Sequence, residues 1–333
     1  MRHSTIIGTG FYVPPNICTN DDLAQMMDTS DEWIQERTGI KQRHFADDGI
    51  GSADLAKHAA EMAIEDAGMT NKDIDMIIFA TLNPDVFFPG SACILQSIMP
   101  FDTIPALDIR QQCTGFIYAV AIADRFIRSG WCDHILVIGA ENHSCGLDFT
   151  TRGRDVAVLF GDGAGAVVMA PTDNDDEGVF DFTLHAQGEF YDTLWLPAPY
   201  GKYKGRITPE MMERGEHYPK MDGRTVFRHA IPRFCEAISE VLEKTGYSIE
   251  DVDLFIPHQA NDRITNMVAQ RTGLPKEKVV SNIARYGNTT AATIPICICE
   301  SRQDNRLKKG SLLLAAAFGS GLTWGAFLMR WSI

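Results

Sequence analysis

An internal repeat constrains the fold of this 333-residue chain more than any other feature. A helix, a turn and a strand in the first half return in the second half with unchanged spacing, and two later strands also return. The matching pairs are 63–79 with 241–257, 134–140 with 311–317 and 165–169 with 325–329. A repeat of β/α units predicts an α/β fold of two like halves around one core. Ligands are then expected near the strand ends where the halves meet.

The repeat divides the chain into an N-terminal half, residues 1–175, and a C-terminal half, residues 176–333. One region, about 188–228, has no counterpart and is rich in Pro, Gly, Tyr and charged residues. Long segments of this kind in a compact domain are often functional. We therefore expect this region to form a connecting cap.

Hydrophobic periodicity predicts the individual elements. The helix at 20–27 is expected to be capped by Asn20 or Asp21, and the strand at 104–109 is expected to be short and buried. The predicted helices are 20–27, 30–38, 51–68, 91–99 and 116–130, and the predicted strands are 74–82, 104–109, 134–140 and 160–169.

Composition excludes several classes of protein. The net charge of −14 argues against nucleic acid or an anionic membrane as the main partner. The N-terminal residues lack the apolar core of a signal peptide, and no apolar run is long enough for a membrane span. The eight cysteines show no zinc-type spacing. These features predict a cytoplasmic protein with free thiols and no bound metal.

Two glycine-rich stretches imitate nucleotide-binding motifs without their context. Residues 5–10 are followed by Pro14 and Pro15 where a dinucleotide-binding helix should begin, and the third glycine is absent. Residues 161–165 precede a strand instead of opening a helix, so their glycines are expected to serve close backbone packing. A nicotinamide-dependent dehydrogenase is thereby excluded.

Cys113 lies between the predicted strand at 104–109 and the predicted helix at 116–130. Unpaired N–H groups and the helix dipole at such a junction stabilise a thiolate. This position suits a nucleophilic sulfur, although most free cysteines are simply small buried hydrophobic residues.

His258 and Asn288 are the candidate partners of Cys113. His258 ends the second-half strand in the segment 256–261, and Asn288 falls opposite Cys113 in the repeat when a gap of three residues is allowed. Taken alone, the first reads as a hydrogen-bonded loop histidine and the second as a turn asparagine. A thiol, an imidazole and a carboxamide together suit acyl transfer through a thioester.

Several segments jointly resemble one family, the β-ketoacyl-acyl carrier protein synthases III. These are condensing enzymes of the thiolase superfamily that begin fatty acid synthesis. The resemblance spans essentially the whole chain, and it implies a thiolase-like fold of two βαβαβ-type halves in α/β/α/β/α layers. The segments are 8–14, 29–34, 37–40, the stretch around Cys113, 161–166, 258–261, 287–289, 318–321 and 323–325.

The resemblance implies a role for each matching residue at the reaction centre. Cys113 would take an acyl group from acyl-CoA. His258 and Asn288 would hydrogen-bond the thioester carbonyl of malonyl-acyl carrier protein as it loses CO2, and the resulting carbanion would attack the acyl-cysteine. The backbone N–H groups of Cys113 and Ser320 would form the oxyanion hole.

The resemblance also implies binding surfaces and partners. Trp33 and Arg152 would hold the CoA adenine from its two faces, with Arg37 nearby. Phe88 would reach into the acyl pocket of a second subunit, which implies a homodimer. Arg263 would help to dock the acidic carrier protein. Acyl-CoA and malonyl-acyl carrier protein are substrates, and no cofactor is implied.

Departures from the family pattern keep alternatives open. The triple glycine near the C-terminus is Gly319-Ser320-Gly321 here, and the 188–228 region looks longer than in the housekeeping enzymes. The segment 108–112 resembles relatives that make quinolones or condense longer chains. A specialised condensing enzyme for longer or aromatic acyl groups is therefore the alternative. A thiol hydrolase and a non-catalytic acyl-binding subunit are less favoured.

Overall fold

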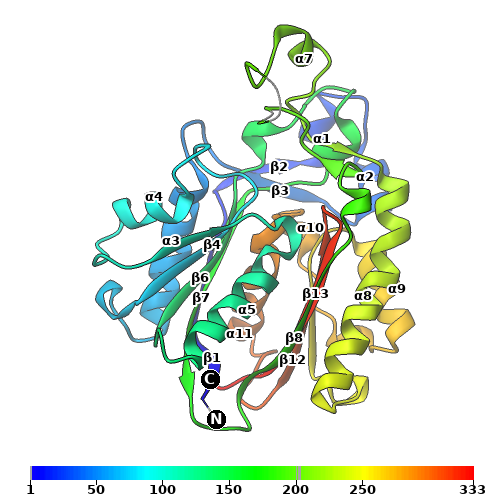
Figure 1. Cartoon of the computed structure of the whole chain (residues 1–333). Coiled ribbons are helices and arrows are strands. Elements are labelled where there is room, and N and C mark those ends of the chain that lie inside the picture. The colour runs from blue at the N-terminus through cyan, green and yellow to red at the C-terminus, as the bar shows by residue number, and fades with distance from the viewer. Residues whose placement is uncertain (1, 200, 202–203) are drawn as a thin grey trace.

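The computed structural model describes residues 2–199, 201 and 204–333, which form two mixed β-sheets (Figure 1). The first sheet consists, in spatial order, of β1 (His3–Tyr12), β7 (Gly163–Thr172), β6 (Ile135–Glu141), β4 (Met76–Ala80) and β5 (Ala106–Ile109). Strand β4 runs parallel to β5 and β6, whereas β7 is antiparallel to β6 and β1. Every residue of β4 and β6 is buried because helices cover both faces of this sheet.

The second sheet repeats the order and directions of the first. It consists of β8 (Gly178–Ala186), β13 (Thr323–Arg330), β12 (Leu312–Gly319) and β11 (Leu254–Pro257). Strands β11 and β12 are parallel, and β13 is antiparallel to both β12 and β8. A single parallel bridge between Phe255 and Val279 lies where a counterpart of β5 would be. The repeat seen in the sequence is thus a repeat of sheet topology.

Helices separate and cover the sheets to give five layers (Figure 1). Two helices lie between the sheets, two cover the outer face of the first sheet and two cover the outer face of the second. The helices between the sheets are α5 (Gly115–Arg128) and α11 (Thr293–Gln303). The outer face of the first sheet is covered by α3 (Ser52–Asp66) and α4 (Ser91–Ile98), and that of the second sheet by α8 (Gly223–Thr245) and α9 (Asp262–Thr272). The α/β/α/β/α arrangement agrees with the prediction.

Smaller elements surround the strand ends at one end of the molecule (Figure 1). The 188–228 region holds α7 and the β9–β10 ribbon, and the hydroxyl of Ser320 donates to the carbonyl of Leu194 in that ribbon. The remaining elements are α1 (Asn20–Ala24), α2 (Asp31–Thr38), α6 (Arg154–Ala157), α7 (Pro209–Glu213), α10 (Ile283–Tyr286), β2 (Asn16–Thr19), β3 (Gln42–Phe45), β9 (Leu194–Trp195), β10 (Lys220–Met221), and the 3-10 turns η1 (Asn71–Asp73), η2 (Gln112–Thr114), η3 (Ser144–Gly146), η4 (Gly188–Phe190), η5 (Ile249–Asp251), η6 (Lys276–Lys278) and η7 (Thr290–Ala292).

Two local predictions differ from the structure. Helix α1 ends at Ala24 and is capped by Thr19, not by Asn20 or Asp21, because Thr19 and Asp22 form a reciprocal capping box. Strand β5 is half-buried instead of fully buried, because it is the edge strand of its sheet.

Glycines allow close approach of the layers, as the second glycine-rich stretch predicts. A Cβ on Gly161 would lie 2.4 Å from the Tyr286 carbonyl oxygen, and one on Gly165 would lie 2.7 Å from the Ile296 nitrogen. The backbone of the first half thus directly contacts that of the second half.

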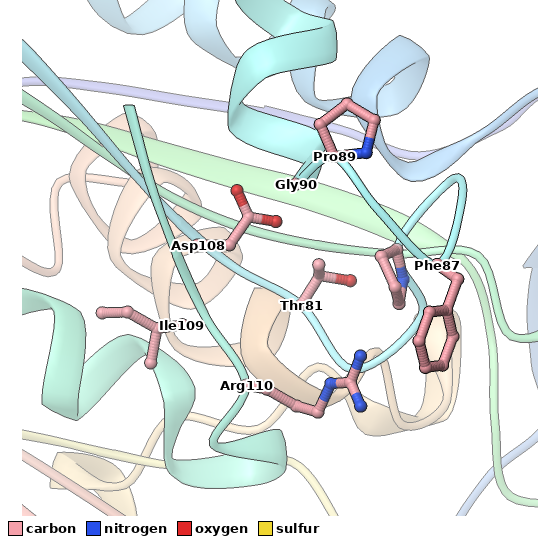
Figure 2. Close-up of a pocket in the computed structure, with 8 residues that line it drawn as sticks. Thr81, Phe87, Pro89, Gly90, Asp108, Ile109 and Arg110 are labelled. Carbon is pink, nitrogen blue, oxygen red and sulfur yellow. The ribbon is translucent and has the colours of Figure 1, made fainter. Parts of the chain in front are cut away.

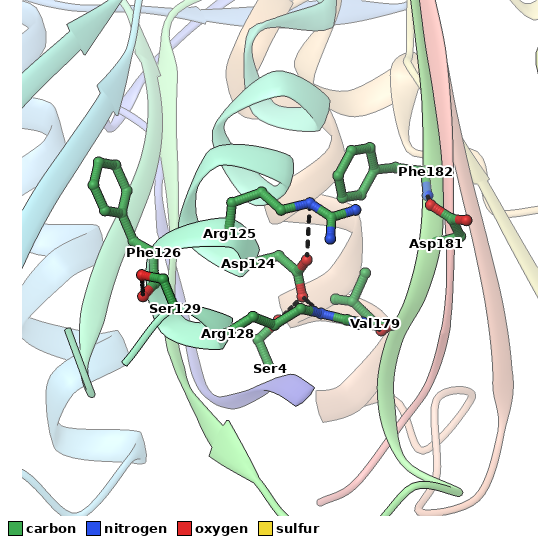
Figure 3. Close-up of polar contacts among 9 residues, drawn as sticks. All are labelled: Ser4, Asp124, Arg125, Phe126, Arg128, Ser129, Val179, Asp181 and Phe182. Atoms are coloured by element: carbon green, nitrogen blue, oxygen red, sulfur yellow. Dashed lines mark hydrogen bonds and ion pairs between the residues drawn. The ribbon is translucent and has the colours of Figure 1, made fainter. Parts of the chain in front are cut away.

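The far end of α5 is fixed to both sheets by the buried Asp124 (Figure 3). Its carboxylate accepts hydrogen bonds from Ser4 Oγ at 2.7 Å and Arg128 Nε at 2.8 Å. Arg128 also donates to the Val179 carbonyl in β8 at 2.7 Å. Because a buried carboxylate needs such partners, this cluster fixes the helix whose other end carries Cys113.

Candidate active site

Cys113 lies in η2, directly before α5, with its side chain buried. A Cβ on Gly319, the last residue of β12, would lie 2.4 Å from the Cys113 Cβ and 2.8 Å from its Sγ. The backbone N–H groups of Ser320 and of Cys113 itself hydrogen-bond to the sulfur and favour its anionic form. The thiol of the first half therefore lies against a strand end of the second half.

The free thiol is protonated at neutral pH. Burial raises the pKa of Cys113 to about 12, and the charge of the neighbouring Glu141 raises it further, while the Ser320 N–H acts in the opposite direction. Burial thus opposes the thiolate that the helix N-terminus is predicted to stabilise. Removal from water outweighs the N–H groups, so the proton must leave as the sulfur attacks.

His258 follows β11 and is buried. Its backbone N–H donates to the Ala316 carbonyl in β12 at 2.8 Å, and its Nδ1 lies 2.7 Å from Thr293 Oγ1 in α11. Its Nε2 is buried and has no hydrogen-bond partner among residues 2–199, 201 and 204–333. Burial lowers the pKa of His258 to about 3, so the ring is neutral.

Asn288 is buried at the start of the turn that leads into α11. Its backbone accepts from the Gly161 N–H at 3.1 Å and donates to the Leu159 carbonyl at 2.8 Å. Its side-chain Oδ1 accepts from the Thr290 N–H at 2.9 Å. These bonds orient the carboxamide so that its oxygen is already used within the chain.

His143 is a further buried group that the sequence analysis missed. Its Nε2 lies 2.6 Å from Thr290 Oγ1 and its Nδ1 lies 2.9 Å from Asn83 Nδ2. Burial, followed by the charge of His258, lowers the pKa of His143 to about 3. Its position just after β6, at the carboxyl end of a central strand, was the available signal.

Glu141, at the end of β6, is the second missed residue. It accepts hydrogen bonds from Thr81 Oγ1 at 3.1 Å and from the backbone N–H groups of Leu82 and Asn83 at 3.1 and 3.2 Å. Burial raises its pKa to about 8 in spite of these donors. The carboxyl group therefore joins the strand end of β4 to the region of Cys113.

The repeat pairs the two active-site turns without a gap. Gln112 and Thr290 open η2 and η7 with φ angles of 44° and 49°, and each turn leads into a central helix. This pairs Cys113 with Ala291. The predicted pairing of Cys113 with Asn288 is therefore wrong, and the gap of three residues is unnecessary.

Of the predicted CoA-binding residues, Trp33 and Arg37 are in contact, whereas Arg152 has other partners. Trp33 lies under two guanidinium groups, that of Arg37 at 4.5 Å and that of Arg154 at 4.7 Å from the ring centroid. Arg152 is turned toward the cap, where it donates to Asp148 at 2.6 Å and to the Glu213 carbonyl at 3.2 Å. The sequence analysis missed Arg154.

The remaining candidates are exposed. Phe88 is 74% exposed in the loop before α4, and Arg263 lies on the first turn of α9 with its guanidinium 5.4 Å from the Phe227 ring. A cavity of about 200 Å³ opens between the loop before α4, which carries Phe87 and Phe88, and strand β5. Figure 2 shows the Arg110 side chain extending toward this loop, and Arg110 belongs to the segment that leads to Cys113.

Metal sites and membrane-spanning helices are the remaining features that the sequence analysis considers. Within the part of the chain that the structure describes, there is no group of three or more His, Cys, Asp or Glu side chains that could hold a metal ion. No helix in the same residues is long and apolar enough to cross a membrane.

Comparisons with known proteins agree on one family. The 3-oxoacyl-[acyl-carrier-protein] synthase III model matches residues 107–188, and the corresponding C-terminal model matches residues 242–331. The β-ketoacyl-[acyl-carrier-protein] synthase III of Geobacillus kaustophilus is 45% identical over 326 residues, which cover 98% of each chain. That of Ehrlichia canis is 43% identical over 332 residues, which cover 99% of this chain and 100% of the relative.

Solved structures of the same family match the fold of this chain. The crystal structure of 3-oxoacyl-[acyl-carrier-protein] synthase III from Aquifex aeolicus matches with a TM-score of 0.89 at 43% identity, over 98% of this chain and 100% of that chain. The corresponding structure from Pseudomonas aeruginosa matches with a TM-score of 0.91 at 36% identity, over 99% of both chains.

The duplicated layers and the buried thiol between the halves define an acyl-transferring condensing enzyme of thiolase-like fold. The chain belongs to the 3-oxoacyl-[acyl-carrier-protein] synthase III family. The predictions of fold class, family and acyltransferase class are thereby confirmed.

Proposed function

We propose that this chain catalyses the condensation that begins fatty acid synthesis. An acyl-CoA acylates Cys113, and decarboxylation of malonyl-acyl carrier protein then supplies the carbon nucleophile. The products are CO2, CoA and a 3-oxoacyl-acyl carrier protein. The observation that carries this proposal is the buried Cys113 thiol of the first half, which lies against Gly319 at the end of a strand of the second half.

Acyl transfer uses the surroundings of Cys113. As the sulfur attacks the thioester carbonyl, negative charge develops on the carbonyl oxygen beside the N–H groups of Cys113 and Ser320. Donors already in place lower the barrier because they need no reorganisation. The thiol proton leaves with the CoA sulfur, which balances the exchange of one thioester for another.

Condensation uses the second half of the site. His258 and Asn288 donate hydrogen bonds to the thioester carbonyl of the malonyl group, which stabilises the enolate formed when CO2 leaves. The enolate carbon attacks the acyl-cysteine, a carbon–carbon bond forms and the Cys113 sulfur is released. A neutral imidazole suits this role, because it can donate a hydrogen bond without placing a positive charge in the buried site.

Binding of the two substrates is assigned to separate surfaces. Trp33, Arg37 and Arg152 bind the CoA nucleotide, and Arg154 joins them because it already lies over the Trp33 ring. Arg263 supports the docking of the acidic carrier protein. The site lies between an N-terminal half, 1–175, and a C-terminal half, 176–333, beneath a cap at 188–228.

The proposal extends to the oligomeric state, the substrates and the cellular compartment. A homodimer brings Phe88 of one subunit to the acyl pocket of the other. The reaction uses acyl-CoA and malonyl-acyl carrier protein as substrates, and none of its steps calls for a metal or another cofactor. Free thiols suit a reducing cytoplasm.

The specialised alternative is not favoured. The first relatives are 41–45% identical over nearly their whole length, and each carries the name β-ketoacyl-[acyl-carrier-protein] synthase III. A hydrolase would need a carboxylate or amide on His258 to orient it as a base, and the contact of its Nδ1 is instead the Thr293 hydroxyl.

Intact-protein mass spectrometry tests the proposal directly. The protein is incubated with acyl-CoAs from acetyl to dodecanoyl, and with an aromatic one, beside the Cys113→Ala variant. We expect a mass increase of one acyl group with a short donor in the wild type and none in the variant. Labelling that persists in Cys113→Ala would remove Cys113 from the mechanism. Labelling only by long or aromatic donors would revive the specialised alternative.

A further inference from the structure

Thr293 is an unassigned residue that contacts the candidate catalytic histidine. Its Oγ1 lies 2.7 Å from His258 Nδ1 and 3.0 Å from the carbonyl oxygen of Thr290. The hydroxyl is buried and has one proton to donate, yet two acceptors lie within hydrogen-bond distance of it. The position of this proton is therefore linked to the protonation of the imidazole.

Two arrangements satisfy the distances. If Thr293 donates to the Thr290 carbonyl, it must accept from His258 Nδ1–H, and Nε2 then carries only a lone pair. If Thr293 donates to His258 Nδ1, the ring proton resides on Nε2, and this nitrogen becomes a donor. The Thr290 carbonyl then loses the hydroxyl as a donor but still accepts from the Thr293 backbone N–H. The bond at one ring nitrogen thus decides the chemistry at the other.

We propose that Thr293 is a positioning residue that donates to His258 Nδ1 and thereby keeps the ring proton on Nε2. This inference rests on the proposed function, in which His258 donates to a thioester carbonyl. Nε2 is buried and has no partner among residues 2–199, 201 and 204–333, so a substrate oxygen would supply its missing hydrogen bond.

His143 fixes the position of the turn that contains Thr290 from the opposite side. Asn83 Nδ2 is a donor, so His143 Nδ1 accepts from it, and His143 Nε2–H donates to Thr290 Oγ1 at 2.6 Å. Thr290 has a left-handed φ of 49°, which is unfavourable for a β-branched residue unless its surroundings fix it. The His143 bond fixes the turn that holds the Thr290 carbonyl near Thr293 and the Thr290 N–H on Asn288.

Nuclear magnetic resonance of deuterated, ¹⁵N-histidine-labelled protein reads the tautomer. The signals of His258 are assigned with a His258→Asn sample. We expect wild-type His258 to be protonated at Nε2, and Thr293→Ser to keep this state. Thr293→Val, which replaces the hydroxyl by a methyl group, should lose the preference. Protonation of the wild-type ring at Nδ1 would overturn the proposal.

Kinetics separates this role from a purely structural one. In Thr293→Val we expect CO2 release from malonyl-acyl carrier protein to slow about tenfold, the size of one lost buried hydrogen bond. Acylation of Cys113 should change less than about threefold, since it does not use the His258 donor. Thr293→Ser should restore CO2 release. An equal loss in both half-reactions, or no loss, would overturn the proposal.

The two proposals fail separately. If the wild type takes no acyl group from any donor, the proposed function is wrong, yet the tautomer measurement still reports on Thr293. If acylation and condensation proceed and Thr293→Val leaves the tautomer unchanged, only the role of Thr293 is wrong. Thr293→Ala, which removes the hydroxyl without a methyl group in its place, covers the case in which valine does not fit.

Discussion

Two buried, neutral histidines face the same turn of this chain. His143 and His258 both contact a threonine of the segment 290–293, and burial is the main reason why the pKa of each is lowered to about 3. Among residues 2–199, 201 and 204–333, neither ring has a carboxylate within hydrogen-bond distance. Each ring therefore forms hydrogen bonds as a neutral imidazole. Because the lowered pKa values favour the neutral rings, each ring also makes the stability of the fold sensitive to acid.

The His143→Gln variant should make the protein less sensitive to acid. Because the folded-state pKa lies below the ordinary value of 6.5, the unfolded chain binds the extra proton first as the pH falls below 6.5. As the pH is lowered from 7.5 to 5, the titration of His143 therefore lowers the free energy of unfolding by about 2 kcal/mol. Urea unfolding at both pH values measures this loss, which should shrink by that amount in His143→Gln.

A matched control identifies the cause of that difference. His58 is exposed on α3, so His58→Gln should leave the pH dependence of the unfolding free energy unchanged. A loss in His143→Gln equal to that of the wild type would mean that His143 is protonated in the folded chain.

At the scale of elements, the site is built from the ends of strands. Strands β6, β11 and β12 end at Glu141, Pro257 and Gly319, and the central helices α5 and α11 begin opposite them. Parallel neighbours end at one edge of a sheet, so the duplication places the chemistry of both halves at one end of the molecule.

Gly319→Ala should slow acylation at least tenfold while preserving the fold. The added Cβ would lie 2.4 Å from the Cys113 Cβ and 2.8 Å from its sulfur, distances that real side chains do not show. The end of β12 and the Ser320 N–H must then move away from the thiol. Acylation followed by mass spectrometry should show at least a tenfold loss of rate, the size expected for a displaced oxyanion donor.

Gly188→Ala is the matched change in the cap. Apart from its chain neighbours, no heavy atom of the residues that the structure describes lies within 4 Å of the Cβ that this variant adds, so its acylation rate should equal that of the wild type. A Gly319→Ala enzyme that acylates normally would mean that the Ser320 N–H takes no part in the reaction.

The sequence predicted elements better than contacts. The repeat and the hydrophobic spacing predicted the strands, the helices and two like halves, because hydrophobic spacing is a local property. His143 and Glu141 were missed because their counterparts in the repeat, Ser320 and Phe318, differ from them in chemistry, and because their role depends on burial by the other half. Arg154 was missed because its distance to Trp33 depends on side-chain conformation, which spacing does not determine.

At the scale of the whole molecule, one apolar region lacks a cover. Val86, Phe87 and Phe88 are exposed in a loop beside β5, and the exposed Leu107 lies on β5 itself. This strand is the edge of its sheet, so one row of its N–H and C=O groups has no strand partner. Exposed aromatic residues next to an open edge suit the contact of a second copy of the chain.

Phe88→Asp should therefore convert a dimer into monomers, because a carboxylate would have to enter the apolar contact without a partner. Analytical ultracentrifugation at micromolar concentration measures the mass of the species in solution. Trp131→Asp is the control, since Trp131 is 59% exposed and follows the opposite end of α5. We expect Trp131→Asp to remain dimeric.

A monomeric wild type, or a Phe88→Asp protein that sediments as a dimer, would contradict the assignment of this region. If monomeric Phe88→Asp also loses acylation by acyl-CoA, the second subunit completes the acyl pocket, and assembly is then a condition for the first chemical step.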